Sequence, residues 1–143
     1  MTRFDAKTSA DRQALFTDAI AAHRARASAY LTIEVDVEVV ERTSELDPAL
    51  GTPWVQFADG IVNLDCTERE FDRCESVLEA FPAFSVADLT RPDEPDEHSG
   101  TESPVNVRIR TVADDDRIGQ FLDALLEETY DLPADYRAWV VEV

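Results

Sequence analysis

The sequence contains 143 residues, of which 44% are hydrophobic, so it can bury one core but is too short for two ordinary domains. Its 31 Asp and Glu residues exceed its 13 Lys and Arg residues, and the formal net charge of -18 argues against nucleic-acid binding, because such a field repels phosphate backbones. No stretch approaches the ~20 apolar residues of a membrane span, and the first residues lack the apolar segment of a signal peptide. We therefore expect a cytoplasmic protein without membrane contact.

The first periodic segments predict a helix and a strand. Apolar residues recur at steps of three and four over 10–29, which is typical of an amphipathic helix that Ser9 or Asp11 would cap. Residues 31–41 alternate between apolar and charged side chains, as in a half-buried strand of an antiparallel sheet. The charged positions of this strand are Glu34, Asp36 and Glu38.

A hairpin and a second helix follow. Asp59-Gly60 separates two short apolar runs, and this dipeptide favours the positive φ angles of a two-residue hairpin turn. Thr67 and Glu70 have the spacing of a capping box, which predicts the start of a helix that Pro82 ends. The elements expected here are strands at 54–58 and 61–65, a helix that reaches Phe81, and a strand at 84–89.

The last third of the chain begins with a change of composition. Residues 90–104 are rich in proline and acidic residues and hold no large apolar side chain, so we expect a mobile acidic surface loop. Residues 105–111 alternate again as a strand. Asp114 to Asp116 favour the start of a helix, because carboxylates complement the positive end of the helix dipole. Residues 136–143 are apolar enough to predict a last strand inside the sheet.

These elements give the order αβββαββαβ and predict one α+β domain over residues 1–143. We expect an antiparallel or mixed sheet of about six strands with about three helices, mainly on one face. From about residue 61 the order βαββαβ is similar to that of ferredoxin-like folds. In that unit the first strand already has two neighbours, whereas the Asp59-Gly60 hairpin also requires 54–58 to pair with it. The sequence leaves the strand order open.

The charge composition indicates the environment of the protein. Lys7 is the only lysine, and the remaining basic residues are arginines. This composition resembles that of cytoplasmic proteins from salt-accumulating halophiles, in which screening over about 3 Å at 1 M salt removes the self-repulsion of excess carboxylates. The alternative is an acidic protein with a basic partner.

The sequence shows no motif that holds a cofactor or performs catalysis. The four glycines are far apart, so there is no glycine-rich phosphate loop. Cys66 and Cys74 lack the spacing and additional ligands of a zinc site, and we expect buried thiols. Asp114 to Asp116 point in different directions at a helix start, which favours a cap over a Mg²⁺ site. We predict no metal and no cofactor.

Two parts of the sequence are candidates for a binding surface. The segment around Pro133 concentrates aromatic side chains that carry polar groups, which indicates either a well-packed connection between a helix and a strand or an interface. The outward faces of strands 31–41 and 105–111 carry opposite charges, which predicts either cross-strand ion pairs or an interface, with a copy of this chain or with another chain. The candidate residues for a ligand or partner are Tyr130, Asp135, Tyr136, Arg137, Trp139, Trp54, Arg108 and Arg110.

We therefore predict a small, non-catalytic interaction or regulatory protein that is adapted to high salt and forms a homodimer. A second hypothesis is a small-molecule sensor, because ferredoxin-like units include ligand-binding regulatory domains of the ACT type, a likeness of fold and not of site. A third is an enzyme that uses carboxylates and a cation, which requires an acid buried beside an arginine in a concave pocket. The basic residues among 1–30 dock either on their own domain or on another chain.

Overall fold

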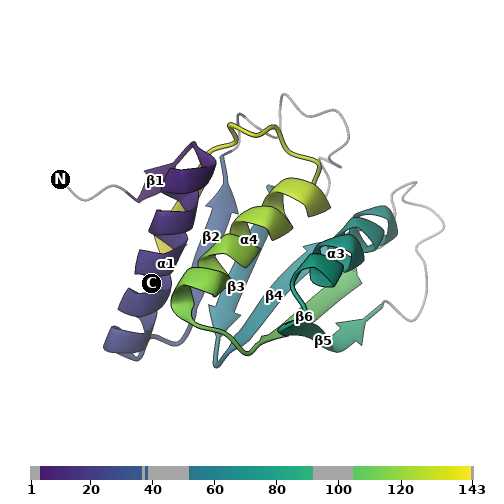
Figure 1. The fold of residues 1–143 in the computed structure, drawn as a ribbon, viewed down its shortest axis with the longest axis horizontal. Coiled ribbons are helices and arrows are strands. Elements are labelled where there is room, and N and C mark those ends of the chain that lie inside the picture. Colours follow the sequence, from purple (N-terminus) through teal and green to yellow (C-terminus); the bar gives the residue numbers. More distant parts are fainter. Residues whose placement is uncertain (1–3, 37, 39–51, 92–104, 143) are drawn as a thin grey trace.

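The computed structural model describes residues 4–36, 38, 52–91 and 105–142. Its strands form a seven-stranded antiparallel sheet of order β1-β7-β2-β3-β4-β6-β5, and the three described helices pack on one face (Figure 1). The predicted α+β class is confirmed. The strands are β1 (Asp5–Ala6), β2 (Leu31–Val35), β3 (Trp54–Ala58), β4 (Ile61–Cys66), β5 (Phe84–Thr90), β6 (Val105–Thr111) and β7 (Ala138–Glu142), and the helices are α1 (Ser9–Arg26), α3 (Glu68–Ala80) and α4 (Asp115–Thr129).

The hairpin at Asp59-Gly60 determines the strand order. Both residues have positive φ, 51° and 75°, and the turn pairs β3 with β4 as predicted. On the other side of β4 lies β6, which separates β4 from β5, so β4, α3 and β5 form a split β-α-β unit. Because β3 occupies the remaining place beside β4, the last strand β7 pairs with β2 instead. It lies inside the sheet, as its apolar sequence predicts.

Two of the predicted helix starts are confirmed by their capping bonds. Thr67 and Glu70 form the reciprocal capping box of α3, with bonds of 2.8 and 3.1 Å between side chains and backbone N–H groups. Asp114 caps α4 by accepting a bond of 2.9 Å from the N–H of Arg117. The carboxylates of Glu70 and Asp114 therefore accept hydrogen bonds from backbone N–H groups at the starts of α3 and α4.

The boundaries of α1 differ from the prediction. The cap is Thr8, whose hydroxyl accepts from the N–H of Asp11 at 3.2 Å, so neither Ser9 nor Asp11 caps the helix. The helix ends at Arg26 because Ala27 adopts the left-handed conformation, with φ 51°. The apolar periodicity of the sequence extends to residue 29, but periodicity does not show where the backbone leaves the helical conformation.

The strand predicted over 31–41 is shorter in the structure. Its alternation is confirmed in β2, where Leu31, Ile33 and Val35 are buried. Beyond the strand, the carboxylate of Asp36 accepts from the N–H of Glu38 at 2.9 Å, a local bond that turns the chain. Residues 37 and 39–41 lie outside the described part, as does the acidic segment 92–104.

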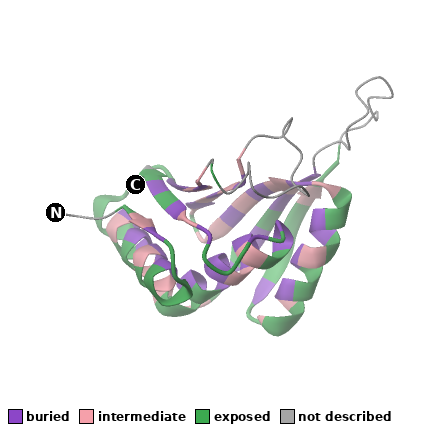
Figure 2. Cartoon of the chain, turned by 90° about the horizontal axis from the view of Figure 1, so that it is seen from above, coloured by how far each residue is buried: buried purple, intermediate pink, exposed green. Residues whose placement is uncertain are grey.

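The core fills the space between the sheet and the layer of helices (Figure 2). α1 and α4 pack most closely at Gly119, where an added Cβ would overlap the Thr17 hydroxyl and press on the Gln13 carbonyl. The glycine therefore permits the close approach of the two helices. The helix stripe predicted on α4 is confirmed, because all of its members are buried: Ile118, Phe121, Leu122, Leu125 and Leu126.

A charged pair lies inside this core. Arg12 on α1 is 0% exposed and Asp123 on α4 is 3% exposed, with 2.6 Å between Nε and Oδ1. Nη1 of Arg12 donates to the carbonyls of Lys7 (2.7 Å) and Tyr136 (2.9 Å). The carboxylate of Asp123 also accepts from the hydroxyls of Ser9 (2.7 Å) and Tyr136 (3.0 Å). The pair therefore connects α1, α4 and the segment that precedes β7.

The basic N-terminal region thus docks on its own domain. Besides the buried pair, Nε of Arg24 lies 3.0 Å from the carboxylate of Asp115 at the start of α4. Both contacts join α1 to α4, so these two basic residues dock on their own domain. The exposed pair contributes less, because solvent screens it.

Replacing Arg12 with Met, or Asp123 with Leu, should each lower the free energy of unfolding by about 3–5 kcal/mol, because either change leaves a buried charge uncompensated. The double variant should lose much less than the sum of the two. Urea denaturation in concentrated KCl measures all three, with Arg24→Met as a control that costs at most about 1 kcal/mol. Additive losses in the double variant would contradict this role.

Candidate functional site

The face of the sheet opposite the helices has no described helix on it (Figure 2). This surface, the open face, is formed by alternate residues of neighbouring strands, and the pairing registers place them in rows. The central row crosses five strands and is polar: Thr32, Gln56, Asn63, Arg108 and Asp88. A second row contains Ala58, Ile61, Arg110 and Ser85. A third contains Asp5, Trp139, Glu34 and Trp54.

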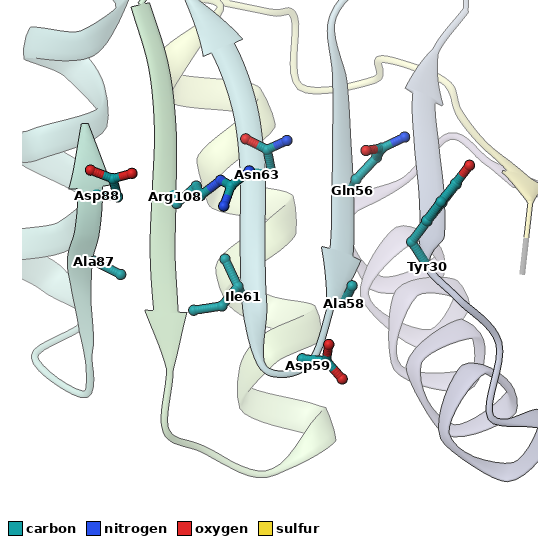
Figure 3. Close-up of a pocket in the computed structure, with 9 residues that line it drawn as sticks. All are labelled: Tyr30, Gln56, Ala58, Asp59, Ile61, Asn63, Ala87, Asp88 and Arg108. Atoms are coloured by element: carbon teal, nitrogen blue, oxygen red, sulfur yellow. The ribbon is translucent and has the colours of Figure 1, made fainter. Parts of the chain in front are cut away.

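A hollow of about 420 Å³ lies on the open face. Three small or aliphatic side chains, Ala58, Ile61 and Ala87, contribute its apolar part. Figure 3 shows the side chain of Arg108 reaching from β6 toward Asn63 on β4. The remaining lining residues are Tyr30, Gln56, Asp59 and Asp88. The hollow therefore combines one guanidinium with two side-chain amides, a tyrosine and two carboxylates.

The two arginines of the open face form no ion pair within the described part of the chain, although Asp88 is the cross-strand neighbour of Arg108. Among the described residues, the side chains of Arg108 and Arg110 form no ion pair and no hydrogen bond, and both are exposed. Glu34 is half-buried between two tryptophans and, within the same part of the chain, also has no ion pair. The open face therefore carries uncompensated charges of both signs.

The predicted cross-strand pairs between these arginines and the acids of β2 are wrong. The cross-strand neighbours of Arg108 are Asn63 on β4 and Asp88 on β5. Strands β3 and β4 separate β6 from β2, so Arg108 and Glu34 are three strand spacings apart, about 14 Å. The alternation correctly placed the arginines outward, but it does not tell which strand is adjacent.

The tryptophans occupy the end of the open face near β7. Trp139 and Trp54 flank Glu34 in the same row, and they are the only two tryptophans in the sequence. Nε1 of Trp139 donates to the carboxylate of Asp36 at 3.0 Å, and the residue is 36% exposed. Large amphipathic side chains at this position are available for contact with another molecule.

The structure divides the predicted site residues between surface and core. Trp54, Trp139, Arg108 and Arg110 all lie on the open face, with Trp139 toward one end on β7 and the arginines toward the other on β6. Tyr130 and Tyr136 do not join them, because both are buried, 4% and 0% exposed. The hydroxyl of Tyr130 donates to the carbonyl of Asp65 at 2.6 Å.

The rest of the predicted segment lies at the start of β7. Asp135 is exposed in the preceding turn, and Arg137 forms an ion pair with Asp5 of β1 at 3.1 Å. Arg137 and Asp5 also line a second hollow of about 480 Å³ at this edge of the sheet, together with Ala6, Lys7, Asp11 and Leu15. The segment therefore does not form a single site.

Sequence reasoning missed several residues of the open face. Gln56, Asn63, Tyr30 and Asp88 belong to no local motif, and only the strand order places them around the same hollow as Arg108. The alternation of apolar and polar residues in β3 and β4 could have identified Gln56 and Asn63 as outward-facing. It could not have shown that β6 is the next strand.

Burial holds the two thiols and Tyr136 in their neutral forms. Burial raises the pKa of the Cys74 thiol to about 12 and raises the pKa of Cys66 further. Burial and the nearby Asp123 carboxylate raise the pKa of Tyr136 well above its usual value. In the described ranges no group of three or more His, Cys, Asp and Glu side chains is arranged to hold a metal ion, and none of the described helices is both long and apolar enough to cross a membrane.

Together, the fold and the open face define an α+β domain with an antiparallel sheet that has helices on one side and a mixed aromatic and charged surface on the other. A family model described as a family of unknown function, DUF7975, matches residues 1–143, and the chain belongs to this family. No curated protein and no solved structure matches the chain.

The raised pKa values predict that the folded protein is inert to thiol reagents. At pH 8 a thiol with a pKa of about 12 has on the order of 1000-fold less thiolate than an unperturbed one. Ellman's reagent should therefore label neither Cys66 nor Cys74 until guanidinium unfolds the chain, after which both should react. Labelling of the folded protein at the rate of free cysteine would contradict the burial of these thiols.

Proposed function

We propose that the protein is a non-catalytic interaction protein of the cytoplasm, adapted to concentrated salt, which binds a protein partner through the open face. The observation that carries this proposal is the set of uncompensated charges and tryptophans on that face. Arginine and tryptophan are enriched at the energetic centres of interfaces. In a chain of net charge -18, two exposed arginines without an acidic partner among the described residues are suited to receive groups from outside.

The buried charges support a non-catalytic role. The third hypothesis requires an acid beside an arginine in a concave pocket, and Asp123 does lie beside Arg12. However, neither of the two hollows described above includes either residue in its lining. The carboxylate of Asp123 already accepts bonds from Arg12, Ser9 and Tyr136, and this arrangement fits a role in packing.

The distribution of the acids supports adaptation to salt. Carboxylates lie exposed along the helix layer, where they hold water and cations, and screening at molar salt limits their mutual repulsion. The exposed acids of the three described helices are Asp11, Asp18, Glu68, Asp72, Glu75, Glu79, Asp116 and Glu128.

The hollow favours a second candidate function, the binding of a small anionic molecule. The guanidinium of Arg108 is suited to a carboxylate, and the amides of Asn63 and Gln56 can bond the remainder of such a ligand. The ring of Tyr30 offers an apolar surface at the rim. This candidate is the small-molecule sensor of the second hypothesis, and its ligand would be the size of a metabolite.

Photo-crosslinking separates the two candidates. Benzoylphenylalanine in place of Tyr30, which is 42% exposed beside the hollow, should give a covalent protein adduct in cells that produce the protein. The same group in place of Ser76, which is exposed on α3, should give none. The adducts are measured as a mass increase on denaturing gels. A small-molecule site predicts no protein adduct at either position, and that result would contradict the proposed function.

A further inference from the structure

We infer that the partner on the open face is a second copy of this chain, seated face to face about a two-fold axis that runs along the β3–β4 pair. The inference rests on the proposed function and identifies the occupant of the same surface. It follows from where the uncompensated charges lie relative to the centre of the sheet.

The strand order makes the open face complementary to itself. β2 lies one strand beyond β3, and β6 lies one strand beyond β4. A two-fold rotation about the β3–β4 line therefore places β2 of one copy over β6 of the other, and the reverse. Glu34 on β2 then faces Arg108 on β6 twice in the dimer. Within one chain the same two side chains are about 14 Å apart and cannot meet.

The registers bring these side chains to a similar height along the strands. Arg108 shares its row with Thr32, and Glu34 is two residues further along β2, an offset of about 7 Å. The long side chain of arginine can span this offset. Figure 3 shows that Arg108 already extends from β6 toward β4 and thus toward the proposed axis.

The other residues of the open face fit the same arrangement. Ala58 and Ile61 on β3 and β4 lie near the axis and supply apolar contact. Arg110 of one copy falls over Tyr30 of the other, a suitable cation–π pair. An axis across the strands would instead stack β6 on β6 and place Arg108 against Arg108, which like-charge repulsion opposes.

The size of the open face suits a stable dimer. Under this axis six of the strands overlap, all except β1, and at ~4.8 Å spacing and ~17 Å for five residues they give roughly 490 Å² in projection. The accessible area of such a corrugated surface exceeds its projection, which brings it toward the ~800 Å² per partner of a standard interface. Each copy carries a net charge of -18, so the dimer should require salt that shortens the screening length to a few Å.

Charge reversal tests the inference, with mass measured by light scattering after size exclusion in about 2 M KCl. The unmodified chain should be a dimer. Glu34→Arg creates two Arg–Arg contacts and Arg108→Glu creates two Glu–Glu contacts, so each variant alone should raise the dissociation constant by ~100-fold or more. An equimolar mixture of the two should recover the dimer, because both contacts are then of opposite charge.

Three further variants keep the test independent of folding and net charge. The double variant Glu34→Arg with Arg108→Glu in one chain should dimerise like the unmodified protein. Arg69→Glu and Glu79→Arg reverse exposed charges on α3, in directions that suit the helix dipole, and should leave the dimer unchanged. Circular dichroism confirms that each variant is folded.

Two outcomes would overturn the inference. One is an unmodified chain that remains a monomer at all concentrations, and the other is a mixture of the two reversed variants that remains monomeric while the unmodified chain dimerises. An adduct between Tyr30-substituted protein and a different polypeptide, together with a monomeric chain, would overturn the second copy and leave the proposed function intact. A monomer without any adduct would overturn both.

Discussion

The buried contact between Arg12 and Asp123 is the constraint on which the arrangement of the domain depends. An uncompensated charge in the core costs several kcal/mol, so the two residues require each other and fix α1 against α4. The same guanidinium binds the carbonyls of Lys7 and Tyr136, next to β1 and β7. One side chain thus connects α1, α4 and the segments next to β1 and β7.

The position of the open face follows from this arrangement. Arg12 and Asp123 draw α1 to the same side of the sheet as α4, and α3 reaches that side through the split β-α-β unit. The described helices are therefore all used to cover one face. No described helix covers the other face, and its side chains divide into an aromatic end near β7 and an end with two arginines on β6.

The sequence predicts the local structure well and the spatial neighbours poorly. The turn at Asp59-Gly60 and the cap formed by Thr67 and Glu70 depend on adjacent residues, and both are present. Arg12 and Asp123 are separated by 111 residues. The sequence shows that Asp123 is a polar residue inside the apolar stripe of α4, but it does not show which residue pairs with it. For the same reason the alternation in β6 places Arg108 outward without showing that it faces Asn63 and not Glu34.

The central claim is that the open face is the surface that becomes covered when the protein binds its partner, and tryptophan fluorescence tests it directly. Both tryptophans, Trp54 and Trp139, lie in one row of that face, so quenching by neutral acrylamide reports on its exposure alone. As the protein concentration rises through the association range in concentrated KCl, the quenching constant should fall, and it should remain high for Arg108→Glu. An equal quenching constant for the free and associated forms would show that association uses another surface and would contradict the account.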